Sequence, residues 1–396
     1  MADLGNQSAI ALVKQSVVGT RVAPTTNDLL AVSSLRPNTD TYTIENPEYT
    51  GAIHKRGAFV TGKGGSVSFT TTIRGPGGAS VPAADAFILG RLLQAAGFTE
   101  NRIAAAIPAA PEAVSTPTTT AVTLGAGAAA TADLYKALLI YLAASGASSS
   151  LKSYSAIVDY TAAKVATLAE TFGSGPAGNY QIPTQLAYQY SSGSTPPVLS
   201  IDIWRGGKKY QMMDMVVSGC RINFATSNRD QTAICSIDWT LSGDVFGVVD
   251  DPAPTIPAIG APAFYRDGDF WLSQKALGIS TVSLDISPRV GYPPNPNKTN
   301  GNDPAQMVET VRSGSVTMNQ VRLTTIDLDA LANAQGTHSI WGQYGLVTGN
   351  SVAFIVPKCR LAFPNDAGDG DFVQNTVDVY IDDADKALAL IFPYFS

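Results

Sequence analysis

Few residues of this 396-residue chain have the type and spacing that chemistry at a site requires. The two histidines, His54 and His338, have no metal-ligand spacing to cysteines or carboxylates, so we expect neither to bind a metal. The glycine-rich segment around Lys63 superficially resembles a phosphate-binding loop. It lacks the full spacing and precedes a strand pattern instead of a helix, so we reject that interpretation.

The densest acidic cluster, residues 365–371, offers a second possible chemistry. Its carboxylates Asp366, Asp369 and Asp371 surround two glycines and could coordinate Ca²⁺ through hard oxygen ligands. Asp-Gly is also a strong hairpin-turn signal, and we favour a turn over an ion site. Since no serine, histidine and aspartate order typical of a hydrolase is visible, we expect no enzyme activity, no catalytic residue and no cofactor.

The composition is typical of a β-rich protein that buries surface against copies of itself. Charged residues make up 15% of the chain, against about a quarter in an average domain. The alternative explanation is simply a bacterial or viral protein rich in small residues. The net charge of −6 argues against tight wrapping of nucleic acid, which needs clustered Lys and Arg. We expect no membrane anchor, because no apolar run approaches the roughly 20 residues that span a bilayer and the N-terminus lacks a signal pattern.

One pattern occurs twice: Cys-Arg, an aliphatic residue, any residue and then Phe, at 220–224 and at 359–363. In both places a Gly-Ser-Val segment precedes the pattern and a short β-like segment follows it. These segments are 65–67 and 314–316, then 236–239 and 376–380. Because the three signals keep their order, we predict two diverged copies of one β-rich domain, which points to assembly before catalysis.

The repeated pattern singles out two cysteines and two arginines. Cys220 and Cys359 lie in apolar strand patterns, so we predict one buried cysteine in each copy and no disulfide between them. Arg221 and Arg360 either form ion pairs between subunits or flank their strands as solvated charges, and both interpretations stay open.

Each copy is predicted to run strand, helix, strand, strand. Residues 66–73 alternate between apolar and polar, as a half-buried strand does. A helix is predicted over 82–96, with Pro82 in its first turn and Gly97 just past its end. A shorter helix is predicted in the second copy, capped by Thr324 or Thr325 and ended by Gly336.

The fold class predicted is mainly β (α+β), with two β-sandwich or barrel domains, each with a flanking helix, and a small β-domain inserted in the first. The predicted divisions are an N-terminal arm at 1–35, a first domain at 36–106 and 200–250, the insert at 107–199, a linker at 251–263 and a second domain at 264–396. The ends of the insert are rich in Ala, Pro, Thr and Ser, which predicts flexible linkers and a unit that projects outward.

The order of these motifs resembles that of phage long-tail (siphophage-like) tube proteins. The resemblance covers both copies and rests on Glu48-x-x-Gly51, Lys55-Arg56, the 64–67 strand and the helix over 83–96. The insert resembles a small β-module that recurs in phage virion proteins, although Ala137 stands where a glycine is usual. The insert motifs are Asp133-x-Tyr135-Lys136, Ile157-x-Asp159-Tyr160 and Lys164-x-Ala166-Thr167.

The resemblance implies a structural virion protein, the major tail tube subunit, assembled in the bacterial host cytoplasm and located in the virion tail. Two tube domains in one chain imply trimeric, pseudo-hexameric rings, because a head-to-tail contact repeats until it closes. Stacked rings then surround a mostly acidic bore that holds the tape-measure protein and genomic DNA, with tail terminator and baseplate proteins as further partners. The alternative is a baseplate hub or a receptor-binding tail component.

Ring stacking is assigned to a long polar loop that precedes the Gly-Ser-Val strand in each copy, at 45–65 and 288–308. Both loops are too long for simple hairpin turns, so we expect them to become ordered on assembly. The candidate inter-ring residues are Glu45, Glu48, Lys55, Arg56, Lys63, Arg289, Lys298 and Asp303.

Overall fold

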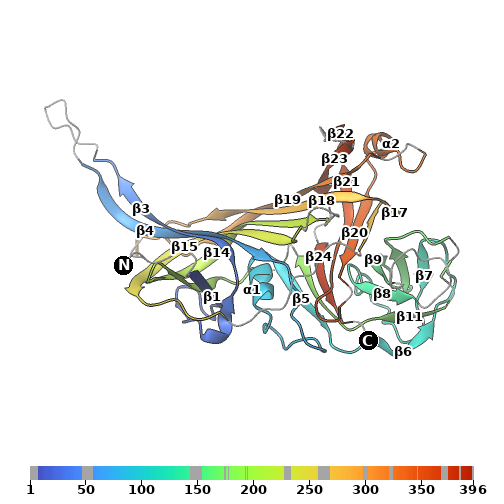
Figure 1. Cartoon of the computed structure of the whole chain (residues 1–396), viewed down its shortest axis with the longest axis horizontal. Coiled ribbons are helices and arrows are strands. Elements are labelled where there is room, and N and C mark those ends of the chain that lie inside the picture. Colours follow the sequence, from blue (N-terminus) through green and yellow to red (C-terminus); the bar gives the residue numbers. More distant parts are fainter. Residues whose placement is uncertain are drawn as a thin grey trace.

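The computed structural model describes residues 8–46, 57–142, 154–173, 175–176, 178–191, 193, 195–226, 233–256, 268–297, 302–320, 324–345, 347–366, 373–382 and 385–394. Strands account for 58% and helices for 5%, which confirms the mainly-β prediction. Long antiparallel strands dominate, and one sheet curls into a half-barrel (Figure 1).

The body is built around one antiparallel sheet in which a strand order occurs twice (Figure 1). The first half contributes β3, β4, β15 and β14 side by side, and the second half continues with β18, β19, β23 and β21. The pairing of β14 with β18 joins the halves. The bounds are β3 Ser33–Ile44, β4 Phe59–Thr72, β14 Lys208–Ala225, β15 Ser236–Asp250, β18 Ile279–Gly291, β19 Gln306–Asn319, β21 Val352–Leu361 and β23 Gln374–Ile381.

The strand order repeats, but the sequence motifs do not keep the same register. In the first half Cys220 lies opposite Trp239. In the second half Val379, which corresponds in sequence to Trp239, lies opposite Leu361, two residues beyond Cys359. A slip by an even number of residues leaves every side chain on its original face of the sheet, so the two copies could diverge this way without exposing their cores.

A second layer of strands covers one face of this sheet in each half. In the first half β1 pairs with β2 and β13, and β13 pairs with β14. In the second half β16 pairs with β17 and β20, and β20 pairs with β21. Strand β24 also pairs with β21, β12 pairs with β24, and β5 pairs with β12. The bounds are β1 Ser8–Lys14, β2 Leu29–Leu30, β5 Phe98–Ile103, β12 Gln185–Ser191, β13 Leu199–Arg205, β16 Asp269–Leu272, β17 Lys275–Ala276, β20 His338–Tyr344 and β24 Asp385–Pro393.

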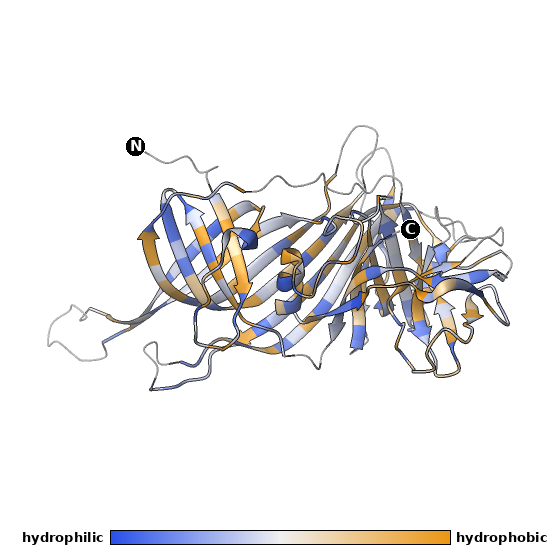
Figure 2. Ribbon diagram, turned by 90° about the horizontal axis from the view of Figure 1, so that it is seen from below, coloured by the Kyte–Doolittle hydropathy of each residue, from blue (hydrophilic) through white to orange (hydrophobic). Residues whose placement is uncertain are grey.

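One apolar core fills the space between the layers and runs through both halves. Apolar and polar residues alternate along many of the strands, as Figure 2 shows from below. Trp239 and Phe69 of the first half and Leu284 and Phe354 of the second belong to this core. A core that crosses the junction holds the two copies together as one body.

The N-terminal region is not the arm predicted for 1–35. Strand β1 lies in the body, and its residues Ile10 and Leu12 are fully buried. Residues 9–13 form an unbroken apolar run, which is typical of a strand buried on both faces. Such a run has no alternation, so the pattern that identifies half-buried strands misses it.

Both predicted helices are present but shorter than expected. Helix α1 spans Ile88–Ala95, because Asp85, at a φ of 60°, breaks any helical path from Pro82. Helix α2 spans Leu328–Asn333 and is capped not by a threonine but by Asp327, whose carboxylate accepts a hydrogen bond from the backbone N–H of Ala330 at 2.9 Å. A 3-10 turn, η1 Thr26–Asp28, precedes β2.

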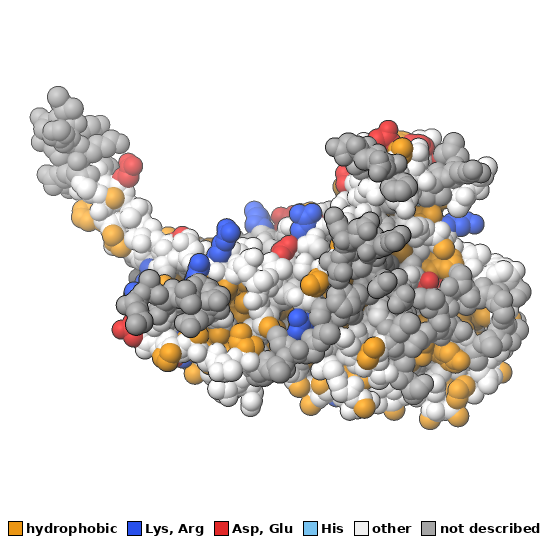
Figure 3. All heavy atoms as spheres, in the orientation of Figure 1, with side chains coloured by type: hydrophobic (Ala, Val, Ile, Leu, Met, Phe, Trp, Pro, Cys, Tyr) orange, Lys and Arg blue, Asp and Glu red, His pale blue; other side chains and the backbone are white. Residues whose placement is uncertain are grey.

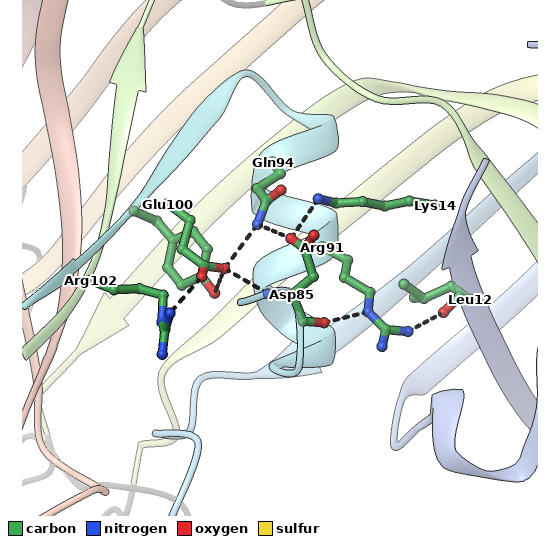
Figure 4. Close-up of polar contacts among 8 residues, drawn as sticks. Leu12, Lys14, Asp85, Arg91, Gln94, Glu100 and Arg102 are labelled. Atoms are coloured by element: carbon green, nitrogen blue, oxygen red, sulfur yellow. Dashed lines mark hydrogen bonds and ion pairs between the residues drawn. The ribbon is translucent and has the colours of Figure 1, made fainter. Parts of the chain in front are cut away.

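A polar network fixes α1 to β1 and η1, and Figure 4 shows its contacts with Leu12 and Lys14 of β1. Arg91 of α1 donates to the Asp28 carboxylate at 2.6 Å, and Lys14 of β1 contacts the Asp85 carboxylate at 2.5 Å. Gln94 also donates to Asp85, at 3.0 Å. Partial burial raises the pKa of Asp28, but hydrogen bonds from Arg91 and from residue 25 outweigh burial and hold this pKa below its ordinary 3.8.

The insert is a six-stranded sheet, which agrees with the predicted β-domain. Its spatial order is β6 Ile107–Ala113, β11 Asn179–Ile182, β8 Leu139–Leu142, β9 Tyr154–Tyr160, β10 Val165–Leu168 and β7 Ala121–Thr123. It is narrower than the predicted 107–199, because β12 belongs to the body. The predicted flexible linker at 108–120 is also wrong in part, since β6 is a paired strand of the insert.

The insert packs against the outer face of the second half (Figure 1, lower right). Trp271, Trp341, Ile355 and Ile391 of the body share one apolar cluster with its core. The Gln274 side chain of the body also donates to the backbone carbonyl of residue 168 at 2.8 Å. The insert is therefore docked on the body, which corrects the expectation of flexible linkers, whereas its outward position in a particle stays a prediction.

Candidate self-assembly surface

The eight-strand sheet has an open edge at one end and a short open segment at the other. Among the described residues β3 pairs with β4 alone, so its other edge is open. At the far end β20 pairs with β21 from Val352 to Cys359, so only the residues of β21 beyond Cys359 are open. An edge strand with unpaired backbone groups accepts a strand from another chain. Inside the chain this has already happened, because residues 220–225 of β14 pair with β18.

The phenylalanines that end the repeated pattern lie in opposite environments. Phe224, at the in-chain junction, is 1% exposed and stacks on Phe354 with the ring centroids 4.2 Å apart. Phe363, past the open end of β21, is 58% exposed. The sequence repeat singles out both residues, but only the structure reveals that Phe224 is buried and Phe363 is exposed.

Arg221 and Arg360, the candidate inter-subunit residues, both take part in ion pairs within the chain. The Arg221 Nε lies 3.5 Å from an Asp285 carboxylate oxygen and donates to the Ser283 hydroxyl at 2.8 Å. Both partners belong to β18, so Arg221 bridges the two copies. The Arg360 Nε lies 3.0 Å from Asp382, within its own copy.

The candidate inter-ring residues that the structure describes divide into two groups. Glu45 and Lys63 are exposed on the hairpin of β3 and β4, which projects from the body (Figure 1). Arg289 lies 3.7 Å from Glu309, and Asp303 accepts a hydrogen bond from an asparagine side chain at 2.6 Å. Glu48, Lys55, Arg56 and Lys298 lie outside the described residues.

The stem of this hairpin exposes apolar side chains beside the charged candidates. Ile44, Phe59 and Val60 are 60%, 60% and 70% exposed. Exposed apolar side chains that cluster together mark a contact surface. The sequence contains the signal, since these residues flank the polar loop on both sides.

The acidic segment forms the predicted hairpin, because β22 Asn365–Asp366 pairs with β23. Asp366 is exposed, whereas Asp369 and Asp371 lie outside the described residues. Among the residues that the structure does describe, no group of three His, Cys, Asp or Glu side chains could hold a metal ion. The glycine-rich segment around Lys63 is part of strand β4, which agrees with rejecting a phosphate loop.

The three cysteines are free and buried, as predicted for the two in the repeats. Burial raises the pKa of the Cys359 thiol to about 12. His338 is buried in β20, where its Nδ1 lies 3.1 Å from the Ser273 hydroxyl and burial lowers its pKa. These groups are structural parts of the core.

No protein-family model matches the sequence, and no curated protein matches it. Over the described ranges, no helix has the length and apolarity needed to cross a membrane. What this chain does must therefore be inferred from its strand order and its surfaces.

Proposed function

We propose that this protein is the subunit of a closed ring, and that such rings stack into the tail tube of a long-tailed phage. One observation carries the proposal: the order β3, β4, β15, β14 is repeated as β18, β19, β23, β21 in one continuous sheet. The junction of β14 with β18 is a head-to-tail contact between two copies, and β21 and β3 are the strands that would repeat it between chains. Repetition of such a contact closes a ring.

Three chains supply the six copies that a pseudo-hexameric ring needs. The exposed Phe363 supports the same contact, because its counterpart Phe224 is buried where two copies already meet. The projecting hairpin of β3 and β4, with Ile44 and Phe59 exposed, supports a contact to the neighbouring ring. Tape-measure protein and DNA in the channel, terminator and baseplate proteins at the ends, and a place in the virion tail belong to this proposal.

The test is the mass and shape of the purified full-length chain. We expect a concentration-dependent trimer by analytical ultracentrifugation, and rings or tubes by negative-stain electron microscopy. Phe363→Asp should abolish both, because it places a charge in the ring contact without touching the subunit core. Leu134→Asp is the matched control, since Leu134 is 39% exposed on the insert. A chain that stays monomeric at every concentration, with no rings in the micrographs, would refute the proposal.

A further inference from the structure

We propose that one face of the hairpin formed by β3 and β4 packs against the second half of the neighbouring chain in the same ring. The contact joins Val60 and Thr43 of one chain to Ala362 and Tyr380 of a second copy. The inference rests on the proposed ring and names a contact within it. The opposite face of the hairpin stays available to the neighbouring ring.

The hairpin of β18 and β19 makes this kind of contact inside the chain. Beyond the residues of β18 that pair with β14, Val290 and Met307 pack against Val198 and Val216 of the first half. Val290 and Met307 are cross-strand partners, and Val216 is buried. The hairpin of the second half is therefore docked on the first half.

The two hairpins share a local irregularity that aligns them. Toward the loop of each hairpin, the ladder skips one residue of the second strand, as a β-bulge does. The pair directly beyond the skipped residue is Val290 with Met307 in the second half, and Thr43 with Val60 in the first. Val60 is therefore the structural counterpart of Met307.

These counterparts differ in exposure. Val290 and Met307 are partly buried in their cluster, whereas Val60 is 70% exposed and Thr43 is exposed beside it. Figure 3 shows hydrophobic side chains on the stem of the projecting hairpin, beyond the body. An exposed apolar residue at a position where the other copy is packed marks a surface that a second chain would cover.

The registers of the sheet identify the matching surface on the second half. In the first half, Val216 of β14 lies opposite Ser242 of β15, and Ser242 lies opposite Ser66 of β4. Ser66 belongs to the Gly-Ser-Val segment, and Ser315 of β19 is the corresponding serine in the second half. Followed from Ser315, the same path across the strands leads to the counterpart of Val216.

This path ends at Ala362. Ser315 lies opposite Asp378 of β23, whose backbone carbonyl accepts a hydrogen bond from the backbone N–H of Ala362 at 2.9 Å. Ala362 follows β21, beyond the residues that pair with β20. Tyr380 lies two residues along β23 from Asp378, on the same face of the strand, and is 56% exposed.

The two surfaces match in chemistry and in position. Val60 is β-branched and Tyr380 is aromatic, and such side chains form favourable pairs across neighbouring strands. A closed ring repeats one head-to-tail contact at every junction. The docking of the second hairpin on the first half should therefore recur between the first hairpin of one chain and the second half of the next.

Cysteine cross-linking of assembled rings tests the contact. Val60→Cys is combined with Ala362→Cys, and the rings are oxidised before denaturing, non-reducing gel electrophoresis. The three native cysteines are buried, so they should not react in the folded protein. We expect linked dimers and trimers and nothing larger, because a contact within a ring of three chains closes on itself.

Phe59→Cys combined with Ala362→Cys is the matched control. Phe59 is the neighbour of Val60 and is 60% exposed, but successive side chains of a strand point to opposite faces. Because a disulfide needs its two Cβ atoms within about 4.5 Å of each other, we expect at least about tenfold fewer linked dimers from this pair.

Val60→Asp gives an independent measurement. A charge buried without a partner is unfavourable, so sedimentation should show at least about tenfold weaker association of the trimer. The urea midpoint of the free subunit should not change, because the side chain is exposed there. Val60→Thr should weaken association far less, since it adds no charge.

The outcomes separate this inference from the proposed function. If the native chain forms no rings in electron micrographs, the proposed function falls before any cross-linking. If rings form but neither oxidation nor a short bismaleimide links Val60→Cys to Ala362→Cys, the inference is wrong and the ring stands. A ladder that continues beyond three chains would place this face of the hairpin against the neighbouring ring, and unchanged association of Val60→Asp would remove it from any contact. Either result overturns the inference.

Discussion

The two halves share one strand order but differ in which of their equivalent residues are buried. The clearest case is the pair of phenylalanines that end the repeated pattern. Phe224 is buried where the first half meets the second, whereas Phe363 ends the second half and is exposed. The residue type is the same, but only Phe224 packs against the other half of the chain, where it stacks on Phe354.

The outer faces of the halves differ as well. In the first half Asp202 of β13 is fully buried and forms ion pairs with Arg21 and with Lys209, the latter at 3.1 Å. In the second half the corresponding strand β20 carries Trp341, which is buried under the insert. Ion pairs of a buried carboxylate thus stabilise this face in the first half, whereas apolar packing against the insert stabilises it in the second. Different substitutions should therefore destabilise the two halves.

Removing the insert should have the largest effect. Ile107 and Ile182 are cross-strand partners, so two glycines can replace residues 107–182 without straining the body. The deletion uncovers Trp271 and Trp341, and an apolar loss of this size costs on the order of 5 kcal/mol of unfolding free energy. Urea denaturation followed by circular dichroism measures this loss. An unchanged midpoint would mean that the insert is an independent unit on flexible linkers.

Truncating the two phenylalanines should give opposite results. Phe224→Ala should lower the unfolding free energy of the subunit by about 3–5 kcal/mol, because it leaves a cavity beside Phe354. Phe363→Ala should change it by less than about 0.5 kcal/mol, since the side chain is exposed. In sedimentation, however, Phe363→Ala should weaken the proposed trimer. Equal effects of the two variants on subunit stability would remove the distinction between a made and an unmade contact.

The sequence predicted what depends on local pattern and repetition. The two-copy order, the β character of the insert, the buried cysteines and the hairpin at 365–371 all follow from periodicity, turn chemistry or the echo of Cys-Arg-x-x-Phe. Each of these patterns is contained in a short stretch of sequence. The alternation of buried and exposed residues is preserved in both copies, because a register slip by an even number of residues keeps each side chain on its face of the strand.

The rest depends on contacts between distant segments. The apolar run at 9–13 becomes a strand only because β13 pairs with it, and the Ala-, Pro- and Thr-rich start of the insert becomes β6 because β11 pairs with it. Asp85 adopts a φ of 60°, which breaks the helical path, and its carboxylate contacts Lys14 of the distant strand β1. The exposure of Phe363 could not be predicted, because its equivalent in the other copy is buried.

Removing one ion-pair partner of the buried Asp202 in the first half should lower the unfolding free energy by an intermediate amount. Arg21→Ala leaves the buried Asp202 with Lys209 as its remaining ion-pair partner, and loss of one member of a buried ion pair costs about 3 kcal/mol. Arg102→Ala is the control, because Arg102 is more exposed and lies 3.8 Å from its carboxylate partner. Chemical denaturation of both variants measures the difference. A loss from Arg21→Ala no larger than that of the control would show that charges do not hold this face closed.

Acid should lower the stability of the first half by weakening the contacts of helix α1. This is the smallest of the predicted effects. Because the folded-state pKa of Asp28 lies below its ordinary 3.8, its contribution is present above that value and is lost as the pH falls through the folded pKa. Asp28→Asn removes the titrating group, so this variant should lose about 1 kcal/mol less stability than the native chain between pH 7 and pH 3. Hydrogen exchange at both pH values should place the native loss in α1 and β1, away from the apolar cover of the second half. Uniform loss of protection across both halves at pH 3 would mean that the ionic and apolar faces respond alike to acid, and the contrast between them would not hold.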